Sequence, residues 1–174
     1  MQSFRVGVGI AIALLMGGIA VAQPAKPTDA QIAHVAYTAG SIDINAAELA
    51  LKKSHSPQVR SFADDMVRDH KAVNDQALAL VKKLNVTPQD NDTSKALVKQ
   101  ANAKKAELSK LNGAAFDRAY IQNEVAYHQA VDGALQNTLI PSATNPELKD
   151  LLTTGLKIFQ GHLQHAEQLA ASVK

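Results

Sequence analysis

The stretch Ser56–His70, SPQVRSFADDMVRDH, decides the fold. It begins with an N-cap serine followed by a proline, which suits the first turn of a helix because that turn needs no backbone donor at this position. Apolar residues then return every three or four positions, as they do on one face of an amphipathic helix. The pattern predicts a long helix over residues 57–84 and places His70 at the centre of its apolar face.

Similar signals predict three more long helices. Thr28 and Gln31 form a capping box that opens a helix over 29–53. Only a short segment containing His55-Ser56 separates this helix from the next, so the two must fold back on each other as an antiparallel hairpin. The remaining long helices are predicted at 114–139 and at 146–172, after a turn over 141–145.

A shorter helix, rich in lysine and alanine, is predicted at 94–111. If it ran straight into the helix at 114–139, the joint helix would be nearly 70 Å long at about 1.5 Å per residue, too long for its partners. We therefore expect a break at Asn112-Gly113. The predicted fold is all-α: a ferritin-like four-helix bundle with a short extra crossover helix between the second and third long helices.

Residues 1–22 have the pattern of a secretory signal peptide. Arg5 precedes the apolar run Val6–Val21, and Ala20-Val21-Ala22 forms an A-x-A cleavage site that would release a chain starting at Gln23. We therefore expect a spacer at 23–28 and a helical domain at 29–174. The expected location is the periplasm or the exterior of a bacterial cell, with no membrane span after cleavage.

The composition excludes several classes of protein. Lys and Arg total 18 against 16 Asp and Glu, so the chain lacks the basic excess of a nucleic-acid binder. The absence of cysteine excludes disulfides, iron–sulfur clusters, thiolate zinc sites and a lipid-anchored lipoprotein. We find no phosphate-binding loop and no Ser-His-Asp arrangement, so no enzymatic reaction is indicated. The protein partner and the oligomeric state stay open.

Polar residues interrupt the apolar faces near the midpoints of the four long helices. Midpoints of equal-length helices share one layer of a bundle, so we expect these side chains to meet: Asp43, His70, Glu124, His128 and His162. Buried imidazoles and carboxylates are costly unless they are paired or metal-bound.

Two interpretations of this layer stay open. One is a site for a transition metal such as Zn, Mn, Fe or Cu, which imidazoles and carboxylates suit. The other is a metal-free hydrogen-bonded network in a structural, partner-binding or stress-associated bundle. A di-iron site needs Glu-x-x-His on two helices, whereas valine or phenylalanine precedes each of these histidines by three. A mononuclear site is therefore the more plausible metal site.

Several motifs resemble the bacterial DUF4142 family, a domain of unknown function. They are the stretch Phe62–His70, Phe116-Asp117-x-x-Tyr120 followed by His128, and Pro146-Glu147-Leu148 followed by His162-Leu163. The resemblance covers about residues 29–172 and implies an exported ferritin-like bundle. His70, His128 and His162 match the family pattern, whereas the family usually has glutamate at the position of Asp43. The resemblance does not extend to His34, His55 and His165.

Overall fold

The predicted caps define the first two helices of the computed structural model, which describes residues 26–172. Helix α1 spans Asp29–Lys53, and the capping box at its start is complete, with Thr28 Oγ1 accepting from the Gln31 N–H at 3.3 Å. Helix α2 spans Pro57–Lys83, and the Ser56 hydroxyl accepts from the Val59 N–H at 3.4 Å. The predicted signal peptide and its cleavage site lie outside the described residues.

The crossover helix and the two later long helices also form. Helix α3 spans Asp92–Ser109 and begins earlier than predicted because the Asn91 side chain caps it, accepting from the Ser94 N–H at 3.1 Å. Gly113 then adopts φ +54°, a conformation that glycine allows, at the predicted break before α4, Gly113–Ala134. Helix α6 spans Pro146–Ser172, as predicted.

The turn predicted at 141–145 begins later than expected. The chain stays helical through the π-helix η1, Leu135–Leu139, and the short helix α5, Ile140–Ser142. Pro141 has no N–H, and inside an α-helix its ring clashes with the carbonyl four residues earlier. The wider turn of η1, in which the Ile140 N–H bonds to the Leu135 carbonyl, gives that ring room and lets the helix continue.

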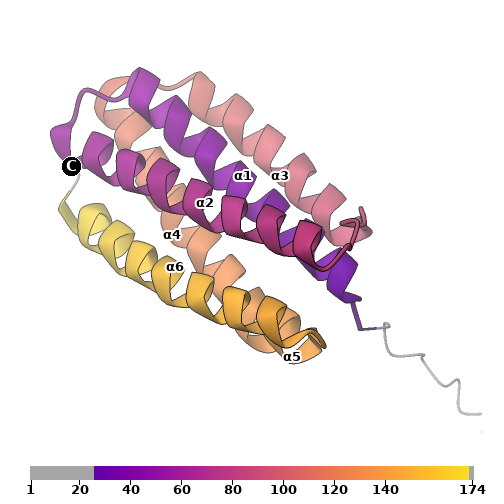
Figure 1. Cartoon of the computed structure of the whole chain (residues 1–174). Helices are drawn as coiled ribbons and strands as arrows, with labels where there is room; N and C mark the ends of the chain where they lie inside the picture. The colour runs from indigo at the N-terminus through magenta and orange to yellow at the C-terminus, as the bar shows by residue number, and fades with distance from the viewer. Residues whose placement is uncertain (1–25, 173–174) are drawn as a thin grey trace, which may run out of the picture.

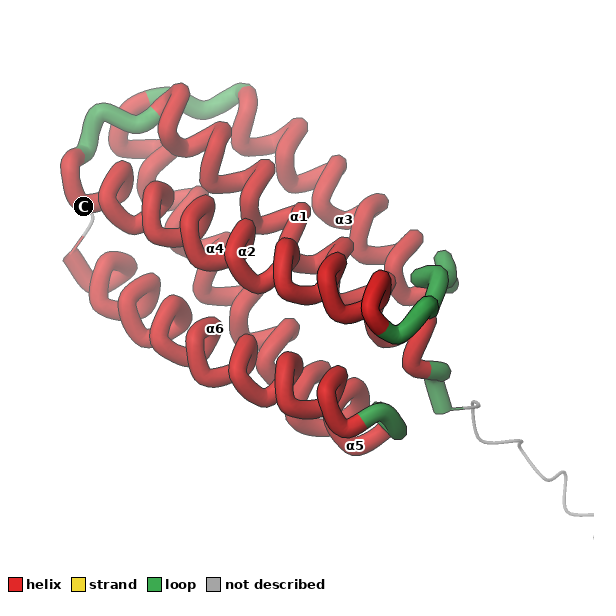
Figure 2. The backbone as a smooth tube through the Cα atoms, in the orientation of Figure 1, coloured by secondary structure: helices red, strands yellow, loops and turns green. Residues whose placement is uncertain are grey.

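The helices form a four-helix bundle with α3 as an added crossover helix (Figure 1). Helix α1 packs mainly on α2, and α4 packs mainly on α6. Helix α3 runs beside α1, since the Gln89 N–H bonds to the Ala30 carbonyl at one end and Lys53 Nζ bonds to the Ser109 carbonyl at the other. Residues 26–172 contain helices and loops but no strand (Figure 2), which confirms the predicted fold class.

Two apolar clusters fill the bundle, one toward each end. We name the first the tight half, because most of its residues have no exposed surface: Ala47, Ala50, Val59, Phe62, Ala63, Met66, Leu108, Phe116, Tyr120, Ile121, Ala166 and Leu169. We name the second the open half, because nearly all of its residues keep a few per cent exposed: Ile32, Val35, Leu135, Leu139, Ala143, Leu148, Leu152 and Phe159.

Within the described part of the chain, no helix combines the length and the apolar character that crossing a bilayer requires.

Candidate metal centre at mid-bundle

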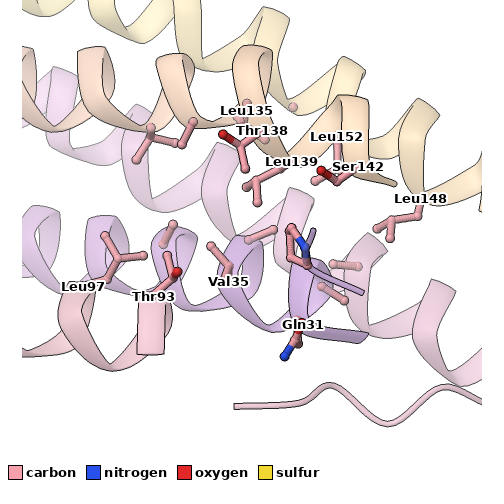
Figure 3. Close-up of a pocket in the computed structure, with 18 of the residues that line it drawn as sticks. Gln31, Val35, Thr93, Leu97, Leu135, Thr138, Leu139, Ser142, Leu148 and Leu152 are labelled. Atoms are coloured by element: carbon pink, nitrogen blue, oxygen red, sulfur yellow. The ribbon is translucent and has the colours of Figure 1, made fainter. Parts of the chain in front are cut away.

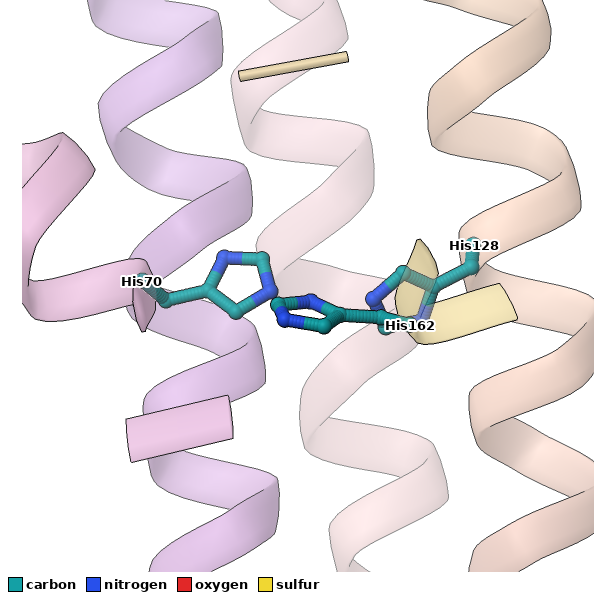
Figure 4. Close-up of side chains that lie close together, drawn as sticks. All are labelled: His70, His128 and His162. Atoms are coloured by element: carbon teal, nitrogen blue, oxygen red, sulfur yellow. The ribbon is translucent and has the colours of Figure 1, made fainter. Parts of the chain in front are cut away.

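The five residues singled out in the sequence come together between the two halves. All five side chains are buried, and they come from four helices: Asp43 from α1, His70 from α2, Glu124 and His128 from α4, and His162 from α6. The centres of the three imidazole rings lie 5.3–5.8 Å apart (Figure 4). The helices therefore bring the predicted polar residues into one layer.

The ligand atoms of this layer form two overlapping groups. One ring nitrogen from each of His70, His128 and His162 lies within 4.8 Å of the others, and so do the ligand atoms of Asp43, Glu124 and His128. Neighbouring ligands around a tetrahedral metal lie about 3.4 Å apart when each bond is about 2.1 Å. The ring nitrogens of the first group would therefore have to move closer together to hold an ion at these bond lengths.

Each imidazole of the layer has at least one buried ring nitrogen without a hydrogen-bond partner in the described residues. The Nδ1 atom of His128 donates to the Glu124 carbonyl oxygen at 3.0 Å, which leaves Nε2 buried with no partner in residues 26–172. The Nε2 atom of His162 donates to Asp69 Oδ2 at 3.0 Å, so Nδ1 of His162 is also buried without a hydrogen-bond partner among residues 26–172. Such hydrogen bonds orient the opposite nitrogen toward a metal. Neither ring nitrogen of His70 has a hydrogen-bond partner among the described residues.

The two carboxyl groups lie against the imidazoles. Asp43 Oδ2 is 3.3 Å from His70 Nε2 and 3.8 Å from His128 Nε2, so the short aspartate side chain still reaches two rings. Glu124 Oε2 is 3.8 Å from His128 Nδ1, and Asn123 Nδ2 donates to Glu124 Oε1 at 3.3 Å. Both carboxyl groups can act as ligands or can orient the histidines.

Burial sets the protonation of the layer. It lowers the pKa of His70 to about 2 and that of His128 to about 4, and it also lowers the pKa of His162. At neutral pH the three imidazoles are therefore uncharged, which is the form that binds metals. Burial and the neighbouring Glu124 raise the pKa of Asp43 well above its usual range, and burial raises that of Glu124 to about 7. Burial therefore favours the protonated form of this carboxyl pair over the doubly charged form.

Aromatic rings surround the imidazoles. The Phe159 ring stacks on His70, with 4.5 Å between ring centres and 8° between ring planes. Tyr127 lies edge-on to His128, and its hydroxyl donates to the Ala39 carbonyl at 3.1 Å. These contacts hold the rings of His70 and His128 in place.

Asp69 is the residue that the sequence reasoning missed. It precedes His70 directly, yet it lies on the flank of α2 and reaches across to His162 on α6. Arg68 holds its other oxygen at 2.7 Å and, together with the His162 contact, lowers the pKa of Asp69. A carboxylate beside the motif histidine was visible in the sequence, but its partner depends on where α6 packs.

The other three histidines lie outside the cluster. His55 is exposed in the turn between α1 and α2, and His34 is partly buried on α1. His165 packs edge-on against Phe62 at 5.2 Å between ring centres.

The family model for DUF4142, a domain of unknown function, matches residues 17–169. The chain belongs to this family. A search among curated proteins gives no match.

Several solved structures share the fold of this DUF4142 chain at low sequence identity. A DUF305 fragment from Deinococcus radiodurans has a TM-score of 0.74 and 18% identity, covering 86% of this chain and 99% of the fragment. A DUF305 protein from Streptomyces coelicolor has a TM-score of 0.71 and 13% identity, and the match covers 83% of this chain and 92% of that protein. CopM in its Cu(II)-bound form has a TM-score of 0.64 and 19% identity, and the match covers 85% of this chain and 100% of the CopM chain.

Proposed function

We propose that this protein binds one transition-metal ion in its mid-bundle layer. His70, His128 and His162 would be the principal ligands, with Glu124 and Asp43 as further ligands or orienting groups. The observation that carries the proposal is the convergence of three uncharged imidazoles, from three helices, whose free nitrogens are buried together. Bundle cores are common places for such sites.

A metal-free network explains the same layer less well. Buried polar groups in native proteins are nearly always hydrogen-bonded, because an unpaired buried group costs free energy. His128 and His162 each make one such bond, but His70 makes none within the described part of the chain. An imidazole that is buried among two other imidazoles and a carboxyl group gains most from a shared metal ion.

The ligand set narrows the choice of metal. Imidazoles and carboxylates suit Zn, Mn, Fe and Cu, and among divalent ions the affinity of such sites is highest for copper. CopM structures of the same fold were solved in Cu(II)-bound and Ag-bound forms, which supports testing copper first. The proposal assigns binding to this protein and no reaction.

The proposed location is outside the cytoplasm. The apolar run Val6–Val21 and the Ala20-Val21-Ala22 site support cleavage by signal peptidase. A protein exported in this way would meet metal ions in the periplasm or the medium.

The direct test is a metal titration of untagged, metal-free protein followed by calorimetry and elemental analysis. We expect about one Cu(II) or Zn(II) per chain and a higher melting temperature with metal, because an ion that binds only the folded state stabilises it. His70→Ala should lower the affinity at least about 100-fold, because it removes one of three imidazole ligands.

The matched control is His165→Ala, which removes a histidine of α6 that lies outside the cluster. It should keep the affinity of the original protein. Circular dichroism would show that both variants are folded, and His128→Gln provides a second variant within the layer. Equal metal affinity in His70→Ala, His128→Gln and His165→Ala would contradict the proposal.

A further inference from the structure

The open half contains a cavity of about 1160 Å³ (Figure 3). Its walls come from α1, α2, α3, α4, η1 and α6, and Leu135, Leu139, Leu148 and Leu152 lie along it in the close-up. This volume is slightly above the range of ordinary ligand pockets, which measure about 300–1,000 Å³. The cavity is therefore large enough for an organic molecule.

The deeper part of the cavity is apolar. Its inner wall includes Ala39, Val73, Val131, Gly155 and Phe159. The polar side chains at this depth already have partners, since Tyr127 donates to the Ala39 carbonyl and Asn74 Nδ2 donates to Ser41 Oγ at 3.2 Å. The inner wall therefore favours a hydrocarbon over a polar ligand.

Polar side chains gather at one end of the cavity, where α1 and α3 begin and where η1 leads into α5. The residues here carry amide, hydroxyl or charged groups: Lys26, Gln31, Asn91, Asp92, Thr93 and Thr138. Of the described residues that line the cavity, only Lys26 and Asp92 are charged. The cavity thus has a polar end and an apolar depth.

The shape of the cavity follows the bundle axis. Its lining runs from Gln31 to Ala39 on α1 and from Leu148 to Phe159 on α6. At about 1.5 Å per residue these spans are about 12 Å and 16 Å long. A space of this length can hold an acyl chain laid along the bundle axis.

The π-helix η1 forms part of the wall through Leu135, Thr138 and Leu139. Such π-helical segments occur frequently at functional sites. The apolar inner wall and the position of η1 in it together favour a ligand-binding role for this space.

We infer that the cavity of the open half binds a long-chain fatty acid. The acyl chain lies along the apolar inner wall toward Phe159, and the carboxyl group lies at the polar end, within reach of the amides and hydroxyls there and of Lys26. This inference does not depend on metal binding, since none of the proposed metal ligands lines the cavity. Phe159 separates the two, because it lines the cavity and stacks on His70.

The test uses the fluorescent fatty acid 11-(dansylamino)undecanoic acid with metal-free protein of the original sequence. We expect a blue-shifted, saturable fluorescence increase with about one site per chain, because the dansyl group or its chain leaves water on binding. Palmitate should displace the probe. A linear, non-saturating signal, or no displacement by excess palmitate, would overturn the inference.

Cavity-filling variants locate the site. Ala77 lines the cavity on α2, whereas Ala79 is exposed two positions further along the same helix. Ala77→Phe should weaken probe binding at least about tenfold, because the new ring occupies the chain's place, and Ala79→Phe should leave the affinity unchanged. Ala36→Phe fills the cavity from α1 and should act as Ala77→Phe does. Equal affinities for the probe in all three variants would overturn the inference. The metal titration is a separate measurement, so the two proposals can fail independently.

Discussion

The two halves of the bundle differ in how completely they are packed. In the tight half, large side chains such as Phe62, Phe116 and Tyr120 have no exposed surface. In the open half, the apolar residues of α1 and α6 surround a cavity of about 1160 Å³. The metal-ligand candidates lie between these halves. One half therefore packs the helices closely against each other, while the other has room for the ligand that we propose.

The polar layer lies between a closely packed half and a half that contains a cavity, so its two sides are packed differently. The helices that carry the histidines are fixed by the tight half, because interdigitated side chains there leave no room for sliding. The layer borders on the open half through Phe159, whose ring stacks on His70. The same substitution should therefore change the free energy of unfolding by different amounts in the two halves.

The largest expected difference comes from matched leucine truncations. Leu108→Ala in the tight half should lower the free energy of unfolding by about 4 kcal/mol, because a closed core cannot refill the space. Leu152→Ala beside the cavity should lower it by about 2 kcal/mol, because that leucine already lacks neighbours on one side. Urea denaturation measures both, and equal losses would remove the distinction between the halves.

A second effect concerns the close approach of α1 and α2 at Gly40. A Cβ atom on Gly40 would lie 2.5 Å from Asn74 Oδ1, and Asn74 is held by hydrogen bonds to Ser41 Oγ and the Tyr37 carbonyl. Gly40→Ala should lower the free energy of unfolding by about 2 kcal/mol.

Gly133→Ala is the control, because no other described atom that could clash lies within 4 Å of its added Cβ. Alanine is the better helix former, so this variant should raise the free energy of unfolding by about 0.7 kcal/mol. A loss in both variants would show that the Gly40 clash is not the cause. Thermal and urea denaturation give the comparison.

A third effect concerns the orientation of His162. Asp69→Asn removes the carboxylate that accepts from His162 Nε2, and we expect metal affinity to fall about tenfold. Asp65→Asn is the matched control, because Asp65 contacts Arg68 at 2.6 Å without contacting His162. Metal titration by calorimetry measures the difference, and an equal affinity in the two variants would mean that Asp69 does not position the ligand.

The smallest expected effect is a pH dependence at Asp132, at the open-half end of α4. Both carboxyl oxygens of Asp132 are buried without a hydrogen-bond partner in the described chain, and burial raises its pKa from 3.8 to about 6. The folded state holds the proton of Asp132 more tightly than the unfolded state does. The protonated side chain therefore makes its full contribution to the free energy of unfolding below pH 3.8, and this contribution is lost as the pH rises through 6.

Asp132→Asn should therefore raise the free energy of unfolding by about 1 kcal/mol at pH 7.5 and by almost nothing near pH 4, because the amide resembles the protonated acid. The exposed Asp75→Asn should show no such pH dependence. Urea denaturation at both pH values is the measurement. A gain that is equal at the two pH values would contradict the assigned cause.

Local signals in the sequence predicted the helices well. Thr28, Ser56 and Pro146 mark helix starts because capping bonds and a missing N–H act within a few residues. The helical period also identified the five polar residues of the central layer, since a residue's face and height follow from its position in a regular helix.

Other features depend on how the helices pack, and the sequence pattern could not supply them. Asp69 acts through His162 on another helix, so its role requires the packing of α6 on α2. The cavity arises where α1 and α6 stay apart, and the extension through η1 arises from the fit around Pro141. Such features come from contacts between distant segments, whereas periodicity describes one helix at a time.

The central claim is that three imidazoles from α2, α4 and α6 hold one metal ion between the two halves. A crystal structure of the copper- or zinc-loaded protein, with anomalous scattering recorded at the metal edge, tests it directly. We predict a single anomalous peak per chain, about 2.0–2.2 Å from nitrogens of His70, His128 and His162. A peak only at His34, His55 or another site away from the layer, or none after loading, would contradict the claim.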